Sequence, residues 1–320
     1  MYRKIMDFLE EWKNEEHRKP LILQGARQVG KTYAILEFGR THYENVAYFN
    51  FETNPKLNET FEENISPDYL IPILSHSAGQ TIVTEKTLIV FDEIQLCERA
   101  LTSLKYFYEE RPDYHIIVAG SLLGVAVNRA RFSFPVGKVD MKTLYPMDLE
   151  EFMIAMGEKS LVDQIKKCFE TNEPMPSALH DAAMQLYRQY LVVGGMPECV
   201  MQFAETRDYI LIRHTQDTIL ASYLNDMSKY NNLNEIKKTR LAYDNITVQL
   251  SKKNTRFQYK LIKKGGRASE FENAIEWLCL SGIVSQVYKV EQIRKPLENY
   301  RDIDAFKIYV SDLGLLCAKK

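Results

Sequence analysis

Short apolar runs alternate with longer amphipathic stretches through the first half of the chain. The apolar runs have the length of buried strands, and the stretches between them show helical spacing. The predicted strands are residues 21–24, 46–51, 88–92, 116–119 and 139–144, and the predicted helices are residues 33–39, 58–75 and 100–110. This alternation predicts an α/β fold, with a parallel sheet covered by helices on both faces.

The pattern changes after about residue 149. Residues 149–204 show helical spacing with one break at residues 172–177, which contain two prolines. Helices continue from about residue 206, and two strand-like runs follow, residues 283–290 and 306–310. We therefore predict three domains, at residues 1–148, 149–205 and 206–320.

The third domain has the element order of a winged helix. A Gly-Gly-Arg turn at residues 265–267 precedes an amphipathic helix predicted over Ser269–Leu280, and a β-hairpin with a proline-containing loop comes next. Ser269 and Glu272 have the spacing of a capping box at the start of that helix. Helix, turn, helix and hairpin in this order predict a winged-helix domain.

Residues 25–32 read GARQVGKT, a full match to the pattern G-x-x-x-x-G-K-[ST] of a phosphate-binding loop (P-loop), and they follow the first predicted strand. In such a loop the backbone N–H groups and the next helix's N-terminus face an anion. Lys31 is expected to reach the β- and γ-phosphates of ATP, or the β-phosphate of ADP, and Thr32 to place its hydroxyl on Mg²⁺. The predicted contact residues are Gly25, Ala26, Arg27, Gln28, Val29, Gly30, Lys31, Thr32 and Tyr33.

A pair of acids closes the third predicted strand. Asp92 and Glu93 follow the apolar run LIVF, at the tip of a strand expected beside the P-loop strand. Asp92 suits Mg²⁺, which keeps several waters and needs few carboxylates. Glu93 is positioned to polarise a water for attack on the γ-phosphate, which favours hydrolysis over transfer to a second substrate. The alternative is a strand that ends in a solvated acidic turn.

A hydroxyl follows the fourth predicted strand. Ser121 comes directly after HIIVAG and next to the P-loop strand in the expected sheet. There it could sense the γ-phosphate or hold the attacking water. It could also cap a helix predicted over residues 122–130, and the two roles are compatible.

Composition narrows the remaining choices. The 45% hydrophobic and 26% charged residues are typical of a globular protein. The five cysteines are scattered without a C-x-x-C pair, which predicts a reducing compartment and no zinc or disulfide framework. The charged N-terminal helix is unlike a secretion signal, and residues 116–127, the longest uncharged stretch of apolar and small residues, are too short to cross a bilayer. We expect a cytoplasmic protein without a membrane partner.

Charge is distributed unevenly along the chain. Residues 229–267 contain 11 lysines and arginines but only two acids, so this segment carries +9 in a chain of net charge −2. Such a segment can mark a surface for nucleic acid, and double-stranded DNA bound through residues 229–280 is one prediction. A basic face docking on an acidic domain of the same chain is the other.

Several motifs occur together in a fixed order: GARQVGKT, IVFDEIQ, AGSLLG, SFPVGKV, YPM with EEF, GGMPE and a late IKKGGRASEFENAIEWL followed by VSDLGLL. Over nearly the whole chain this set resembles bacterial AAA-type ATPases whose C-terminal half is a domain of unknown function, the DUF4143 group. The resemblance implies a STAND-related AAA+ core followed by a winged helix. It also implies that Gly195 and Pro197 lie near the nucleotide base, whereas the residues alone indicate an interhelical turn.

The chain departs from this family at two places. Family members continue beyond DLGLL into a nuclease-like fold, so we expect that domain to be absent from a chain ending at Lys320. The chain is then either truncated or naturally short. Where relatives carry arginine after a glycine, Gly137 is followed here by Lys138, which lacks the planar guanidinium that bridges phosphate oxygens.

The resulting hypothesis is Mg²⁺-dependent ATP hydrolysis by Lys31, Glu93 and Ser121. In AAA-type rings an arginine between the fourth and fifth strands acts on the neighbouring subunit, which makes Arg129 and Arg131 candidates and implies a homo-oligomer; the alternative for both is a solvated helix end. A slow nucleotide-gated DNA-binding switch and a scaffold with little turnover remain alternatives. A P-loop kinase is disfavoured, because kinases must exclude the water that Glu93 would activate.

Overall fold

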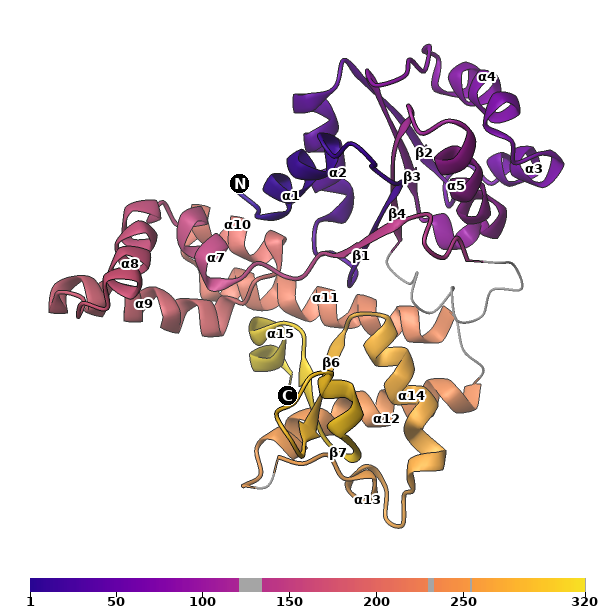
Figure 1. Ribbon diagram of the computed structural model, residues 1–320. Helices are drawn as coiled ribbons and strands as arrows, with labels where there is room; N and C mark the ends of the chain where they lie inside the picture. Colours follow the sequence, from indigo (N-terminus) through magenta and orange to yellow (C-terminus); the bar gives the residue numbers. More distant parts are fainter. Residues whose placement is uncertain (121–133, 230–232, 254, 320) are drawn as a thin grey trace. The chain divides into compact units, whose positions relative to one another are not determined.

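The computed structural model describes residues 1–120, 134–229, 233–253 and 255–319 (Figure 1). Its contacts divide the chain into two compact units. The N-terminal unit contains residues 2–145, and the C-terminal unit contains residues 146–320 together with Met1. The helical region and the C-terminal section, expected above as two domains, thus share one unit.

The N-terminal unit alternates strands and helices as its sequence pattern predicts. Its strands are β1 (Leu21–Gln24), β2 (Asn45–Asn50), β3 (Thr87–Asp92), β4 (His115–Gly120) and β5 (Asp140–Thr143). Its helices are α1 (Ile5–Lys13), α2 (Lys31–His42), α3 (Lys56–Glu63), α4 (Pro67–Ala78), the short 3₁₀ helix η1 (Ile94–Leu96) and α5 (Glu98–Glu110). The single helix predicted over residues 58–75 is two helices. The first ends at Glu63, and the second begins at Pro67, with Ser66 as its N-cap residue, because proline suits the first position of a helix.

The five strands form one parallel sheet in the order β2-β3-β4-β1-β5. The expectation that the strand of Asp92 lies beside the P-loop strand is wrong, because β4 lies between β1 and β3. Since all strands run in the same direction, the C-terminal ends of β1, β3 and β4 still lie at the same edge of the sheet. That edge is where ligands bind in open α/β sheets.

Both faces of the sheet are covered, since α1 and α2 lie on one side and α3, α4 and α5 on the other (Figure 1). β3 and β4 are buried at every position, as expected for central parallel strands. On the side of α5, Phe49, Phe51, Phe61 and Phe91 pack with ring centroids 5.6–5.9 Å apart. This core fixes the strand ends that carry the candidate site.

The C-terminal unit is mainly helical and ends in a hairpin. Its elements are α7 (Leu149–Ala155), α8 (Lys159–Thr171), α9 (Ser177–Val193), α10 (Pro197–Thr206), α11 (Tyr209–Lys229), α12 (Leu233–Leu250), α13 (Tyr259–Ile262), α14 (Ala268–Leu280), β6 (Val284–Val290), the 3₁₀ helix η2 (Leu297–Tyr300), β7 (Arg301–Val310) and α15 (Leu313–Ala318). The predicted break at residues 172–177 separates α8 from α9. β6 and β7 form an antiparallel pair.

The start of α14 differs from the prediction. Arg267 is the N-cap residue and makes no side-chain capping hydrogen bond, so the capping box predicted from Ser269 and Glu272 does not form. The helix begins two residues earlier than the capping pattern requires, which places Ser269 inside its first turn. A capping box forms elsewhere in the unit, between Asp148 and Glu151 at α7.

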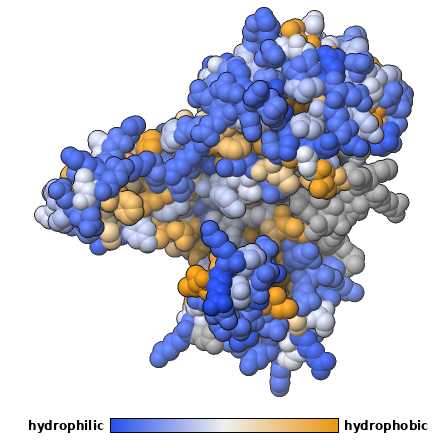
Figure 2. Space-filling model, in the orientation of Figure 1, coloured by the Kyte–Doolittle hydropathy of each residue, from blue (hydrophilic) through white to orange (hydrophobic). Residues whose placement is uncertain are grey.

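None of the described helices is long and apolar enough to cross a membrane. Hydrophilic residues cover most of the face of each unit shown in Figure 2. Exposed large side chains such as Phe169 and Tyr187 also occur on α8 and α9.

Candidate nucleotide site

The P-loop joins β1 to α2 in the geometry that its sequence predicts. Helix α2 begins at Lys31, directly after Gly30, whose left-handed conformation (φ 89°) turns the chain into the helix. At the other end of the loop, a Cβ on Gly25 would lie 2.2 Å from the carbonyl oxygen of Leu144. A side chain at this position would therefore separate the loop from the strand beside it.

Lys31 is the central cation of the loop. Its side chain is buried, and Nζ donates hydrogen bonds to the carbonyl oxygens of Gly25 (2.9 Å) and Ala26 (2.8 Å). Burial lowers the pKa of Lys31 to about 8, although the nearby charges of Glu93 and Asp92 oppose that shift. The ammonium group thus lies inside the loop, where no carboxylate of the described residues is bonded to it, and an anion beside it would replace lost hydration.

Asp92 receives hydrogen bonds from three parts of the unit. Thr32 Oγ1 donates to Asp92 Oδ2 (2.8 Å), Tyr48 OH donates to the same oxygen (2.7 Å), and the Glu93 N–H donates to Oδ1 (2.9 Å). The two residues predicted to place Mg²⁺ are therefore in direct contact. Tyr48 was missed from the sequence, because only the pairing of β2 with β3 brings its hydroxyl to Asp92.

Glu93 lies just past the strand in an unusual conformation. Its backbone is left-handed (φ 52°, ψ 41°), which costs a residue with a Cβ on the order of 1–3 kcal/mol and is found mostly at functional sites. Its carboxylate accepts a hydrogen bond from the side-chain amide of Gln95. Gln95 is a second residue that sequence reasoning missed, although it stands in the quoted IVFDEIQ motif.

Arg3 supports the P-loop from within the N-terminal unit and was also missed. Its guanidinium is buried and donates hydrogen bonds to the carbonyl oxygens of Val29 (3.0 Å) and Tyr145 (2.8 Å). A buried guanidinium that bridges two backbone carbonyls holds the loop at a fixed distance from the segment after β5. No sequence pattern marks Arg3, because its partners are 26 and 142 residues away.

Comparisons with known proteins agree with this geometry. Residues 17–153 match a family model described as an AAA domain, and residues 184–320 match a domain of unknown function, DUF8612. The N-terminal unit has a P-loop NTPase fold and is similar to AAA domains. The C-terminal match corrects the resemblance stated above, since it is to DUF8612 and not to the DUF4143 group.

Solved structures share the fold at low identity. A Walker-type ATPase of Pyrococcus abyssi is similar over 99% of this chain and 95% of its own, with 14% identity and a TM-score of 0.58. The ORC2 protein of Aeropyrum pernix, in ADPNP–ADP complexes, has 11% identity, covers 93% of this chain and 85% of its own, and has a TM-score of 0.44, too low to support an argument. A search of curated proteins finds no match.

Three catalytic candidates of the AAA domain, Ser121, Arg129 and Arg131, lie outside the described residues. Lys138, which stands where relatives carry arginine, lies away from this site. It precedes β5, at the sheet edge opposite the P-loop, and its ammonium pairs with Glu109 at 3.0 Å. The register places it there, because Asp140 pairs with Leu21 at the start of β1.

The second glycine-rich segment is packed against its own unit. The Gly195 N–H donates to Asp312 Oδ2 (2.6 Å), and a Cβ on Gly195 would lie 2.0 Å from the carbonyl oxygen of Met147. Pro197 is the first residue of α10, a position that suits proline. The segment is therefore a turn between α9 and α10 whose backbone is bonded to Asp312, the N-cap residue of α15. These contacts account for its glycines without a bound nucleotide.

The basic segment, residues 229–267, lies within the predicted winged-helix domain. The helix that follows it, α14, is acidic. This helix carries Glu270, Glu272 and Glu276 and no lysine or arginine. Within the segment, Lys238 pairs with Glu235 and Lys263 pairs with Glu270, each at 3.0 Å. A helix of this charge would repel phosphates in a DNA groove.

Proposed function

We propose that the chain binds ATP with Mg²⁺ and hydrolyses it to ADP and phosphate. The observation that carries this proposal is the convergence of the P-loop with the acidic strand end. Thr32 Oγ1 lies 2.8 Å from Asp92 Oδ2, and both acids are close enough to Lys31 to influence its pKa. The AAA-type fold of the N-terminal unit supports the same reaction.

The residues present fit a triphosphate and its metal. The loop amides, Lys31 and the N-terminus of α2 would hold the phosphates, and Thr32 and Asp92 would hold Mg²⁺ through its ligands and waters. When bound, the metal neutralises charge that develops on the phosphate oxygens. Lys31 would exchange its two carbonyl partners for phosphate oxygens, a stronger, charge-assisted bond.

Glu93 is the proposed base. Its position one residue after Asp92 places its carboxylate next to the metal site, and Gln95 fixes one of its oxygens. The carboxylate would orient a water in line with the γ-phosphate and accept its proton. Ser121 is proposed to sense the γ-phosphate, and Arg129 or Arg131 to act on a neighbouring copy of the chain in a homo-oligomer.

The test separates binding from turnover. Lys31→Ala should abolish ATP binding, since it removes the central cation, whereas Glu93→Gln should bind ATP normally and lose about 10²–10⁴ in turnover. Fluorescent-nucleotide titration and phosphate release measure the two quantities. Lys56→Ala and Glu52→Gln are matched controls, because both side chains are exposed on the same unit.

Normal turnover by Glu93→Gln would show that another group is the base. ATP binding unchanged by Lys31→Ala would remove the site itself. Phosphate release should be measured across protein concentration, because an arginine supplied by a neighbouring subunit makes the rate per subunit rise as the oligomer forms. A constant rate per subunit would argue against Arg129 and Arg131 acting between copies.

A further inference from the structure

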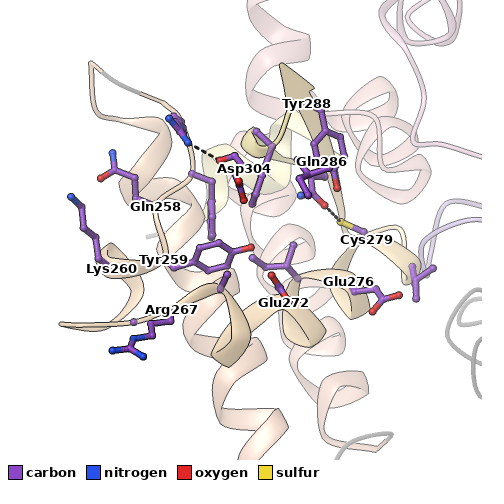
Figure 3. A pocket seen from close by; sticks show the side chains of 18 residues that line it. Gln258, Tyr259, Lys260, Arg267, Glu272, Glu276, Cys279, Gln286, Tyr288 and Asp304 are labelled. Atoms are coloured by element: carbon purple, nitrogen blue, oxygen red, sulfur yellow. Dashed lines mark hydrogen bonds between the residues drawn. The ribbon is translucent and has the colours of Figure 1, made fainter. Parts of the chain in front are cut away.

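A cavity of about 930 Å³ lies in the C-terminal unit between α13, α14 and the β6–β7 hairpin (Figure 3). Aromatic rings form much of its wall. Phe306 is central, with ring centroids 5.5 Å from Phe257, 6.1 Å from Tyr259 and 5.8 Å from Tyr288. The two phenylalanines are buried, and the two tyrosines are half-buried and line the space.

Three carboxylates line the same cavity. Glu272 and Glu276 come from α14, and Asp304 comes from β7. Among the described residues, no lysine or arginine side chain forms an ion pair with any of them. Burial raises the pKa of Tyr259 to about 12, and the charges of Glu272 and Asp304, which line the same cavity, act in the same direction.

Two of the three cations that line the cavity, Lys260 and Arg267, point away from its rings. Figure 3 shows the side chains of Lys260 and Arg267 extending away from Tyr259, at one side of the cavity. Arg256 donates to the backbone carbonyl of Asp304 (2.8 Å) and leaves the carboxylate of Asp304 free of that bond. The centre of the cavity is therefore aromatic and acidic.

A cation of the chain itself already packs on one of these rings. The guanidinium of Arg301, which is not part of the cavity lining, lies 4.4 Å from the ring centroid of Tyr288. Cations pack against aromatic faces and pair with carboxylates, and arginine does both because its guanidinium is planar. A cation entering the cavity would meet rings and unpaired carboxylates together.

We propose that this cavity binds a peptide segment of a partner protein that inserts an arginine or lysine side chain between Tyr259 and Tyr288, against Glu272 and Asp304. The volume lies near the upper end of the range for ligand cavities, so it accommodates a segment and not only one side chain. The three carboxylates make DNA phosphate an unsuitable occupant. The site is independent of the nucleotide site.

The experiment uses the full chain and fluorescent nonapeptide pools with a fixed central residue. Pools centred on arginine or lysine should bind, and a pool centred on citrulline, which keeps the shape of arginine without its charge, should bind about tenfold more weakly. Glu272→Gln combined with Asp304→Asn should reduce binding of the arginine pool by a similar factor. The exposed pair Glu298→Gln with Asp181→Asn changes the net charge equally and should have no effect.

A second pair of variants tests the ring. Tyr259→Leu should weaken arginine-pool binding by several-fold, and Tyr259→Phe should retain it, because the cation packs on the ring face. Both variants should be folded by circular dichroism. The proposal fails if the citrulline pool binds as tightly as the arginine pool, or if the double carboxylate variant binds like the unchanged chain. It also fails if a DNA duplex displaces the peptides and binds more tightly to the double variant, which would mark a nucleic-acid surface.

Discussion

Two glycine-rich segments of this chain, residues 25–32 and residues 194–197, serve different ends. In the first, the chain curves around a buried ammonium group, Lys31, whose partners are two carbonyl oxygens of its own loop. In the second, the backbone approaches other backbone so closely that its own unit fills the space, with Asp312 bonded to the Gly195 N–H. The first segment surrounds a cation that an anionic ligand can contact, and the second packs its backbone against other backbone atoms of its unit.

The difference shows why glycine content alone is a poor guide to a binding site. Glycine lets another group approach the backbone closely, and that group can be a ligand, a neighbouring strand or a capping carboxylate. Asp312 illustrates the third case, since its Oδ1 also accepts from the Leu315 N–H and caps α15. Burial raises the pKa of Asp312, while backbone N–H groups, including that of Gly195, oppose the shift.

The largest expected effect is on folding. Gly195→Ala would place a Cβ 2.0 Å from the carbonyl oxygen of Met147, and this overlap should reduce the free energy of unfolding by about 3 kcal/mol. Gly157→Ala is the control, because no atom lies within 4 Å of its Cβ position and only the cost of its positive φ, about 1–2 kcal/mol, remains. Thermal denaturation measures both.

ATP affinity of the Gly195→Ala variant sharpens the comparison. Measured well below the unfolding transition, it should equal that of the unchanged chain, because the glycine serves packing. A loss of affinity by the folded variant would instead support the role beside the nucleotide base that the family resemblance implies.

The next effect is a dependence of ATP affinity on pH. Burial holds the pKa of Lys31 at about 8 in the free protein, and a bound triphosphate would raise it, so the complex takes up a proton. Affinity should be full below that pKa and fall about tenfold between about pH 7 and pH 9. Calorimetry in buffers of different ionisation enthalpy should detect the proton uptake.

Lys31→Arg is the control for this titration. Its guanidinium stays charged over the whole range, so the affinity of the variant, whatever its absolute value, should be insensitive to pH. An equal pH dependence in both proteins would assign the effect to a group other than Lys31.

The smallest effect concerns Tyr48. Tyr48→Phe removes one of the two hydroxyls that donate to Asp92 Oδ2, which should raise the Mg²⁺ concentration for half-maximal turnover by about threefold to fivefold, the equivalent of about 1 kcal/mol. Mg²⁺ titration of phosphate release measures this. Tyr69, whose hydroxyl donates to the carboxylate of Glu63 in the same unit, is the control, and Tyr69→Phe should leave the midpoint unchanged. A similar shift in both variants would show that the contact of Tyr48 with Asp92 is incidental.

Much of the N-terminal unit could be predicted from local pattern. The five strands lie within two residues of their predicted bounds, and the P-loop ends in a helix, because both depend on neighbours in sequence. The winged-helix prediction is only partly matched. The helices and the hairpin occur in the predicted order, but the capping box does not form and α14 is acidic, so its charge does not favour DNA.

The amino-acid sequence by itself determined the strand–helix alternation, the phosphate loop and the identity of the acids at 92 and 93, since each is written in consecutive residues. Only the tertiary structure decided that β4 separates β1 from β3, that Tyr48 and Thr32 share one oxygen of Asp92, and that Arg3 supports the loop. These contacts join residues far apart in the chain. Their partners are selected by strand order and register, which no local spacing encodes.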